Sequence, residues 1–475
     1  MKKYIILLLL SCWIGSCSNY LDLKPKNVLT PQTLDDVKTI AAKYFEEITS
    51  GVFRRYSVFN TVGGMANHEF HYMDCDIEFM GMFPMIGELN KHKFQWIDTE
   101  FQKNVWFGIY SAIGDLNLSL YELERVEGDD TERRQLKAEL LMHRALLFTK
   151  LLEYFTPYAP NEYAKEIDRY GLPFLWGPED LNVNLYPQRV SQKETFRLIL
   201  GEVDKIQQLN VEPGVWNMLY NERTLHGLFA EIYWWKAESC AKEATDWENA
   251  RKHALLCIAD HKPANNEEEL AAQFDPFVTS ELTPFKLVCA NTSTAYSQFF
   301  SFIEAWAIAE DLYSSYAPED IRLNQYYATD FFGTKILKKF DIADKAKKRV
   351  MTMWRVEEMW MIVAESYART GDKVTAQQYL KDLQDRRVTT FQGNTGDILQ
   401  DILSERRREF ALEGNLRWLD MKRMGIKIDR DTPIDKVFTL EKNDFRYTFQ
   451  IPVDGELDVN PNNFQNPGWD IVKFD

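Results

Sequence analysis

The stretch from residue 68 to residue 78 brings together side chains that could bind a metal or act as acids. His68-Glu69-Phe70-His71 resembles the H-E-x-x-H zinc motif, but its histidines are three positions apart instead of four, which misplaces the second ligand and the base. Asp74, Asp76 and Glu78 alternate, as in a calcium loop or on one face of a strand. Calcium requires more oxygen ligands and a glycine at the sharp turn. We therefore interpret the acids as a solvated patch and predict no metal.

A second charged group runs from Glu405 through Arg406, Arg407 and Arg408 to Glu409, with Glu413-Gly414 after it. It could form an anion site or a structural network. On a helix, Glu405 faces Arg408 and Glu409, and Arg406 faces Glu409 one turn on. Gly414 stands where a helix end favours a left-handed residue, and Arg417, Trp418 and Asp420 follow on a second short helix. We favour ion pairs that lock two helices together.

Enzyme motifs are missing from the chain. The sequence has no G-x-S-x-G elbow, no P-loop, no G-x-G-x-x-G and no H-E-x-x-H. Its 72 acidic residues allow many imagined acid/base pairs, and no single pair stands out. We predict a protein that is not an enzyme, with no catalytic residue and no cofactor.

The first residues have the order of a secretory leader. Two lysines at positions 2 and 3 precede an apolar run from Tyr4 to Leu10, and Gly15-Ser16-Cys17 follows. The apolar run is too short to cross a hydrocarbon layer of roughly 30 Å, which takes about 20 helical residues. Small residues directly before a cysteine form a bacterial lipobox, so we predict acylation of Cys17; the alternative is an ordinary signal peptide with a chance cysteine. Buried acyl chains contribute about 0.8 kcal/mol per methylene, enough to anchor a soluble body.

Composition bounds the rest of the chain. With 475 residues, 45 % hydrophobic and 14 % aromatic, it can bury a large core as one domain or two closely packed ones. The net charge of −16 argues against nucleic acid and against electrostatic docking on anionic lipid. Cys240 and Cys257 fall in helical patterns typical of small core residues. With Cys75 and Cys289 they form no metal spacing, and a disulfide among the four stays open.

Helical periodicity dominates the elements that must position these residues. It is clear near 106–120 and near 136–155, where Pro157 and Pro160 end the second helix. Segments 230–257 and 364–383 each read as two helices around a turn, the second with Gly371 at the turn, like a tetratricopeptide hairpin. The first helix is expected near Leu34, after an extended tether. We predict an all-α, mainly helical scaffold of hairpins, with irregular stretches at roughly 51–104, 157–190, 262–350 and 429–475.

At this point the charged run and its neighbours resemble the C-terminal signature of the SusD/RagB family of Bacteroidetes. Further matches are Arg355 with Glu358, Ala364-Glu365-Ser366, Phe449-Gln450-Ile451-Pro452, Gln465-Asn466-Pro467-Gly468, Gly171-Leu172-Pro173-Phe174, and the start Cys17-Ser18-Asn19-Tyr20-Leu21-Asp22. The resemblance covers essentially the whole chain. It implies that the signature residues are structural. These are Glu405, Arg406, Arg407, Glu409, Glu413, Gly414, Arg417 and Asp420.

The resemblance also implies a function and an organisation. Family members are surface-exposed outer-membrane lipoproteins that bind oligosaccharides, or in some cases peptides, and form a lid over a SusC-like TonB-dependent transporter. On this basis we expect a signal peptide at 1–16, a lipidated tether at 17–33 and a body at 34–475. The body would divide into an N-terminal portion of about 18–225 and a C-terminal portion of about 226–475.

The family's ligand loops vary too widely to carry ligand residues over. Carbohydrate sites use aromatic faces and polar side chains, so we select candidates of these types from the irregular stretches. They are Tyr72, Asp74, Trp96, Phe299, Phe300, Trp306 and Arg322. Core packing is the competing interpretation for each aromatic, and it is favoured for the tryptophans on scaffold helices (Trp234, Trp235, Trp360 and Trp418).

Three other functions remain open at this stage. The ligand could be a peptide or another nutrient instead of a glycan. An exported helical glycosidase would also be rich in tryptophan and aspartate, and it would release product from an oligosaccharide. A pure protein-interaction scaffold of stacked hairpins would bind another chain and no small molecule.

Overall fold

The computed structural model describes residues 31–49, 73, 75–79, 91–177, 180, 186–215, 217–290, 306–331, 333–339, 348–431 and 437–472. The longer helices are α2 (Leu34–Thr49), α7 (Thr99–Leu123), α8 (Asp130–Phe155), α10 (Gln192–Leu209), α11 (Glu222–Lys236), α12 (Asp246–Ile258), α17 (Val356–Arg369), α18 (Lys373–Asp385), α19 (Ile398–Glu409) and α20 (Leu416–Met424). Short helices are α6 (Lys91–Phe94), α13 (Glu267–Ala272), α15 (Glu310–Tyr313) and α16 (Ile321–Tyr326).

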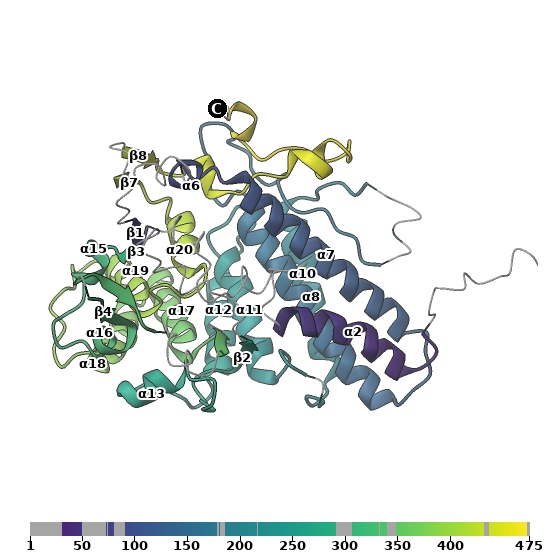
Figure 1. The fold of residues 1–475 in the computed structure, drawn as a ribbon, viewed down its shortest axis with the longest axis horizontal. Coiled ribbons are helices and arrows are strands. Elements are labelled where there is room, and N and C mark those ends of the chain that lie inside the picture. Colours follow the sequence, from purple (N-terminus) through teal and green to yellow (C-terminus); the bar gives the residue numbers. More distant parts are fainter. Residues whose placement is uncertain are drawn as a thin grey trace, which may run out of the picture.

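Helical hairpins form the scaffold. Helices α7 and α8, α11 and α12, and α17 and α18 pack against each other in pairs, and the last two pairs are the predicted hairpins. Helix α10, which was not predicted, packs against α8 and α11, and α12 packs against α17, so the pairs continue into one stack (Figure 1). The prediction of a mainly helical, hairpin-based fold is confirmed. No helix of the described part is both long and apolar enough to cross a membrane.

Local chemistry explains where these helices begin and end. Asp129 accepts the Glu132 amide at 2.8 Å and caps α8. Asn221 and Thr224 form a reciprocal capping box at the start of α11. The turn between α17 and α18 is made by Gly371, whose φ is +96°. Glycine is favoured there because residues with a side chain are strained in that conformation.

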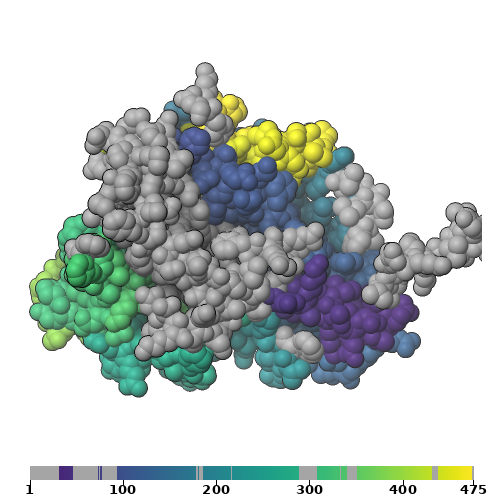
Figure 2. Space-filling view, in the orientation of Figure 1, coloured from purple at the N-terminus to yellow at the C-terminus, as the bar shows by residue number. Residues whose placement is uncertain are grey.

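Helix α8 is the centre of the main core. Every residue from Ala138 to Phe155 is buried, so this part of the helix is covered on all sides. Helix α2, by contrast, lies at the surface (Figure 2) and buries one face, with Val37, Ala41 and Tyr44 each at most 1 % exposed. The Tyr44 hydroxyl and the His143 Nδ1 atom are 3.0 Å apart, which joins α2 to α8.

Four two-stranded ribbons complete the described fold. They pair β1 (Ile77–Phe79) with β3 (Trp306–Ile308), β2 (Phe285–Ala290) with β6 (Lys348–Met353), β4 (Tyr327–Thr329) with β5 (Lys335–Leu337), and β7 (Ile428–Asp431) with β8 (Val437–Leu440), all antiparallel. These strands lie inside or beside the stretches predicted to be irregular, so that prediction was wrong in detail.

The C-terminal part of the chain returns to the end of α8. The Lys422 ammonium donates to the Glu153 carbonyl at 2.6 Å, and the Phe449 amide donates to the Tyr154 carbonyl at 2.9 Å. The Asn466 side-chain amide donates to the Phe155 carbonyl at 2.9 Å. Together with Arg189, which donates to the Phe155 carbonyl at 3.3 Å, these distant residues satisfy the last carbonyls of α8. Burial lowers the pKa of Lys422 to about 7.

Cys240 and Cys257 form no disulfide in the described part of the chain, and the side chain of Cys289 lies outside it. Cys257 is buried in α12, as predicted. Cys240 was expected in a helix but lies in the turn after α11, half-buried.

Candidate functional site

The β1–β3 ribbon joins two of the stretches from which ligand contacts were predicted. Ile77 lies opposite Ile308, and Phe79 lies opposite Trp306. Tyr72 and Asp74 precede β1 in the chain, and Phe299 and Phe300 precede β3; all four lie outside the described residues. Trp306 begins β3. The ribbon therefore connects segments that are more than 200 positions apart in sequence, at one end of the molecule (Figure 1).

Arg407 fastens this ribbon to the helical scaffold. Its Nε atom donates to Asp76 Oδ1 at 2.8 Å, directly before β1, and its Nη atoms donate to Asp311 at 2.8 and 3.1 Å, just after β3. Asp76 is fully buried and paired with Arg407, so the prediction of a solvated acidic patch was wrong for this residue. Its carbonyl accepts the Ala309 amide at 2.9 Å. One arginine on α19 thus holds both sides of the ribbon, and charge-assisted bonds of this kind are short and strong.

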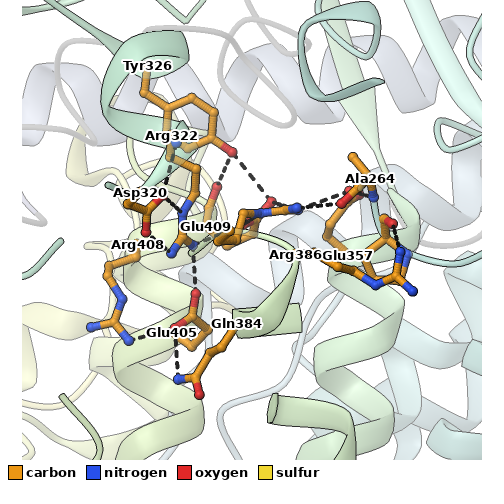
Figure 3. Close-up of polar contacts among 12 residues, drawn as sticks. Ala264, Asp320, Arg322, Tyr326, Glu357, Gln384, Arg386, Glu405, Arg408 and Glu409 are labelled. Carbon is orange, nitrogen blue, oxygen red and sulfur yellow. Dashed lines mark hydrogen bonds and ion pairs between the residues drawn. The ribbon is translucent and has the colours of Figure 1, made fainter. Parts of the chain in front are cut away.

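The inward face of α19 forms a buried ion-pair network (Figure 3). Glu405 accepts from Arg322 at 2.7 Å and from Arg408 at 2.6 Å. Glu409 accepts from Arg387 at 2.8 Å and from Arg322 at 3.0 Å. Buried carboxylates are stable only when paired and hydrogen-bonded, and here each has at least two cationic partners.

The remaining signature residues extend this network. Arg355 pairs with Glu413 at 2.8 Å, and Arg406 pairs with Asp420 at 2.8 Å, which ties α19 to α20. The expected Arg406–Glu409 pair is wrong, since Arg406 faces Asp420 instead. Gly414 has the predicted left-handed φ of +56°, but it lies in the turn beyond Phe410, where α19 is capped.

Electrostatics keep the two glutamates of the network charged. Burial alone would raise the pKa of Glu405, but Arg322 and Arg408 lower it to about 2. Arg387 and Arg322 likewise hold the pKa of Glu409 far below its usual value against the effect of burial. Glutamates that stay ionised and are enclosed by arginines cannot contact a substrate. The network therefore has a structural role, and it holds α19 in position against the neighbouring helices.

Two of the predicted ligand contacts are interior residues, which corrects the sequence-based selection. Trp96 is 1 % exposed, and its indole donates to the Met73 carbonyl at 2.9 Å. Arg322 is fully buried and bonded to Asp320, Glu405 and Glu409. Neither side chain presents a surface to a ligand. Trp234, Trp235 and Trp418 are buried as expected, and Trp360 packs against Tyr379 with the two rings tilted by 52°.

Sequence reasoning missed the arginines around Trp96. The Arg430 guanidinium, on β7, lies 4.7 Å from the Trp96 ring centroid and donates to Cys75 Sγ at 2.8 Å. Arg446 donates to the Gln95 carbonyl at 3.0 Å. Such contacts join residues about 350 positions apart, so no local pattern could have revealed them. The β7–β8 ribbon is thereby held beside the residues that lead into β1.

The comparisons with known proteins agree with this architecture. The family model described as "Starch-binding associating with outer membrane" matches residues 19–208, and the model described as "SusD family" matches residues 309–469. No curated protein matches the chain.

Several solved structures share the fold. The chain is similar to a SusD-like carbohydrate binding protein from Bacteroides vulgatus (19 % identity, 94 % of this chain and 100 % of that one, TM-score 0.70). It is also similar to SusD superfamily proteins from Bacteroides thetaiotaomicron (20 %, 92 % and 100 %, TM-score 0.68) and Bacteroides fragilis (19 %, with 92 % of this chain covered, TM-score 0.69). Matches at both ends of the chain, joined by this fold, lead to one conclusion: the chain belongs to the SusD family.

Proposed function

We propose that this protein is an outer-membrane lipoprotein that binds an oligosaccharide and delivers it to a SusC-like TonB-dependent transporter. It acts as a binding protein and not as an enzyme, as is usual for its family. The description of one matching family model, starch-binding and associating with the outer membrane, supports both the ligand class and the location. The carbohydrate-binding relative from Bacteroides vulgatus supports the ligand class.

The observation that carries this proposal is the attachment of the β1–β3 ribbon to the scaffold. Arg407 and the Asp76 backbone fix both strands to α19 and α15. The segments that lead into these strands hold four candidate ligand contacts. Binding loops that start from rigid elements lose less conformational freedom on capture, which favours affinity.

The anchor in this proposal is Cys17. Acyl chains on this thiol would hold the protein to the outer leaflet, and residues 18–33 would form the tether to α2. Mass spectrometry of the mature protein tests this directly: an acylated N-terminal cysteine is expected, and a Cys17→Ala variant should leave the membrane fraction. An unmodified N-terminus with soluble protein contradicts the anchoring.

The ligand is tested by isothermal titration calorimetry of the chain from residue 18 with a panel of oligosaccharides, starting with maltooligosaccharides. Saturable binding without release of shorter products supports a binding protein. Saturable binding of mixed peptides instead would move the assignment to peptide uptake, and product release would indicate a glycosidase. Co-purification of the lipidated protein with a TonB-dependent barrel tests the transport partner.

A further inference from the structure

Two arginines near the β1 end of the ligand segments have no acidic partner. Arg430 is 9 % exposed, and its Nη1 atom is buried without an acceptor while Nη2 donates to the Cys75 thiol. Arg417 is half-buried, and its Nε atom is also buried without an acceptor. Within the described part of the chain, neither guanidinium forms an ion pair with a carboxylate. All the other arginines of the signature run do.

These two arginines belong to one neighbourhood. The ring of Trp418, next to Arg417 in the chain, lies 5.0 Å from that of Tyr447, and Arg446, next to Tyr447, lies over the same Trp96 ring as Arg430. Burial and the nearby Cys75 raise the pKa of the Tyr447 phenol, whereas the charges of Arg417 and Arg446 lower it. Arg430 hydrogen-bonds to that same Cys75 and stacks on Trp96. Arg446 differs from the other two, because Asp444 neutralises it at 2.7 Å. Among the described residues neither Arg417 nor Arg430 therefore has a carboxylate at ion-pair distance; Asp311, the partner of Arg407, acts on Arg417 only from farther away.

An uncompensated buried cation is costly to keep in a folded protein. The chain as a whole carries a net charge of −16, so two arginines without ion-pair partners in the described part are a local exception. Guanidinium groups with unused N–H donors match carboxylates, which they bind with two parallel hydrogen bonds. The cluster also lies directly beside Asp76 and β1, where the predicted ligand segment enters the ribbon.

We propose that Arg430 and Arg417, beside Cys75, recognise a carboxylate on the bound nutrient, which makes the ligand an acidic, uronate-containing oligosaccharide. This inference rests on the proposed function, because it specifies the substrate class of the same site. Stacking on Trp96 holds the Arg430 guanidinium in place, so little side-chain entropy is lost on binding. Trp96 then acts by supporting the Arg430 guanidinium and needs no contact with the sugar.

Cys75 provides a reporter that needs no knowledge of the nutrient. The rate of its alkylation by the anion iodoacetate is compared with the rate for neutral iodoacetamide, peptide by peptide, by mass spectrometry. Cys240 is the internal control, since it is also half-buried. We expect the iodoacetate-to-iodoacetamide ratio at Cys75 to exceed that at Cys240 at least five-fold, and to fall to the Cys240 value in Arg430→Gln. The same ratio at both cysteines of the unaltered protein overturns the proposal, whatever the variant does.

The substrate class is tested by calorimetry with oligosaccharides of galacturonate, glucuronate and mannuronate, each beside its methyl ester. We expect one acid form to bind at least ten-fold more tightly than its ester, with that difference lost in Arg430→Gln and kept in Arg197→Gln, an exposed arginine on α10. Equal binding of acid and ester, or binding of neutral glycans alone, overturns the inference and leaves the proposed function standing. Binding of no saccharide overturns both.

Discussion

Replacing Arg407 by glutamine should loosen the β1–β3 ribbon and destabilise the protein measurably. The arginine has two acidic partners of different character, Asp311 with 70 % of its side chain exposed and Asp76 with none. The exposed pair contributes under about 1 kcal/mol. Loss of the buried pair leaves a carboxylate without its cation, which costs about 3–5 kcal/mol. We expect a total loss of about 3–5 kcal/mol in the free energy of unfolding, measured by urea denaturation.

A double-mutant cycle and hydrogen exchange make this prediction specific. Asp76→Asn removes the charge that Arg407 leaves behind, so the double variant should be more stable than additivity predicts, by about 1–3 kcal/mol. The amide of Ala309, which donates to the Asp76 carbonyl, should exchange faster in Arg407→Gln, whereas amides of α11 and α12 should not change. Arg197→Gln is the control and should leave the urea midpoint unchanged. Additive effects, or an Arg407→Gln loss below about 1 kcal/mol, would refute the clamp.

Three further predictions test packing, backbone strain and charge. A Cβ added at Gly227 on α11 would lie 2.6 Å from a buried indole, so Gly227→Ala should lower the free energy of unfolding in urea by about 1–3 kcal/mol. Gly201 on α10 has open space around it, so Gly201→Ala should instead raise that free energy by up to about 1 kcal/mol. Ala259 closes α12 with φ of 53° and ψ of −126°, and Ala259→Gly should therefore raise the melting temperature by relieving about 1 kcal/mol of strain. Despite burial, arginines hold the pKa of Glu365 at about 2, below its usual 4.5. The contribution of this carboxylate to the free energy of unfolding should therefore be lost as the pH falls from 4.5 to 2. Burial raises the pKa of Glu358 to about 7, so stability should increase as pH falls from 7 to 4.5; Glu358→Gln should flatten this upper limb in urea denaturation at stepped pH.

The helical scaffold was predictable because its signals are local. Apolar residues at three- and four-residue spacing, proline after α8 and Gly371 at a turn all act within one or two helical turns. The pairing of Glu405 with Arg408 followed from the same geometry. The ion pairs that leave α19 could not be predicted in this way. Arg406 has several acids within reach in sequence, and it pairs with Asp420 on the next helix.

The candidate site was harder to predict because long-range contacts build it. The β1 and β3 strands are three residues each, too short for an alternating pattern, and they pair across more than 200 positions. Trp96 and Arg322 have the residue types of a sugar site, yet both are interior. Composition cannot separate a tryptophan that faces a ligand from one that supports an arginine.

The capping of α8 by distant residues has a consequence for biosynthesis. Asn466 reaches the Phe155 carbonyl across 311 positions, and Lys422 reaches Glu153 across 269. A nascent chain that has completed α8 can satisfy part of the helix end with Thr156 and Arg189, but the remaining donors are made only when nearly all of the chain has been synthesised. The first and last thirds of the chain must therefore complete their folding together, so fragments that contain only one of them should aggregate when they are expressed separately.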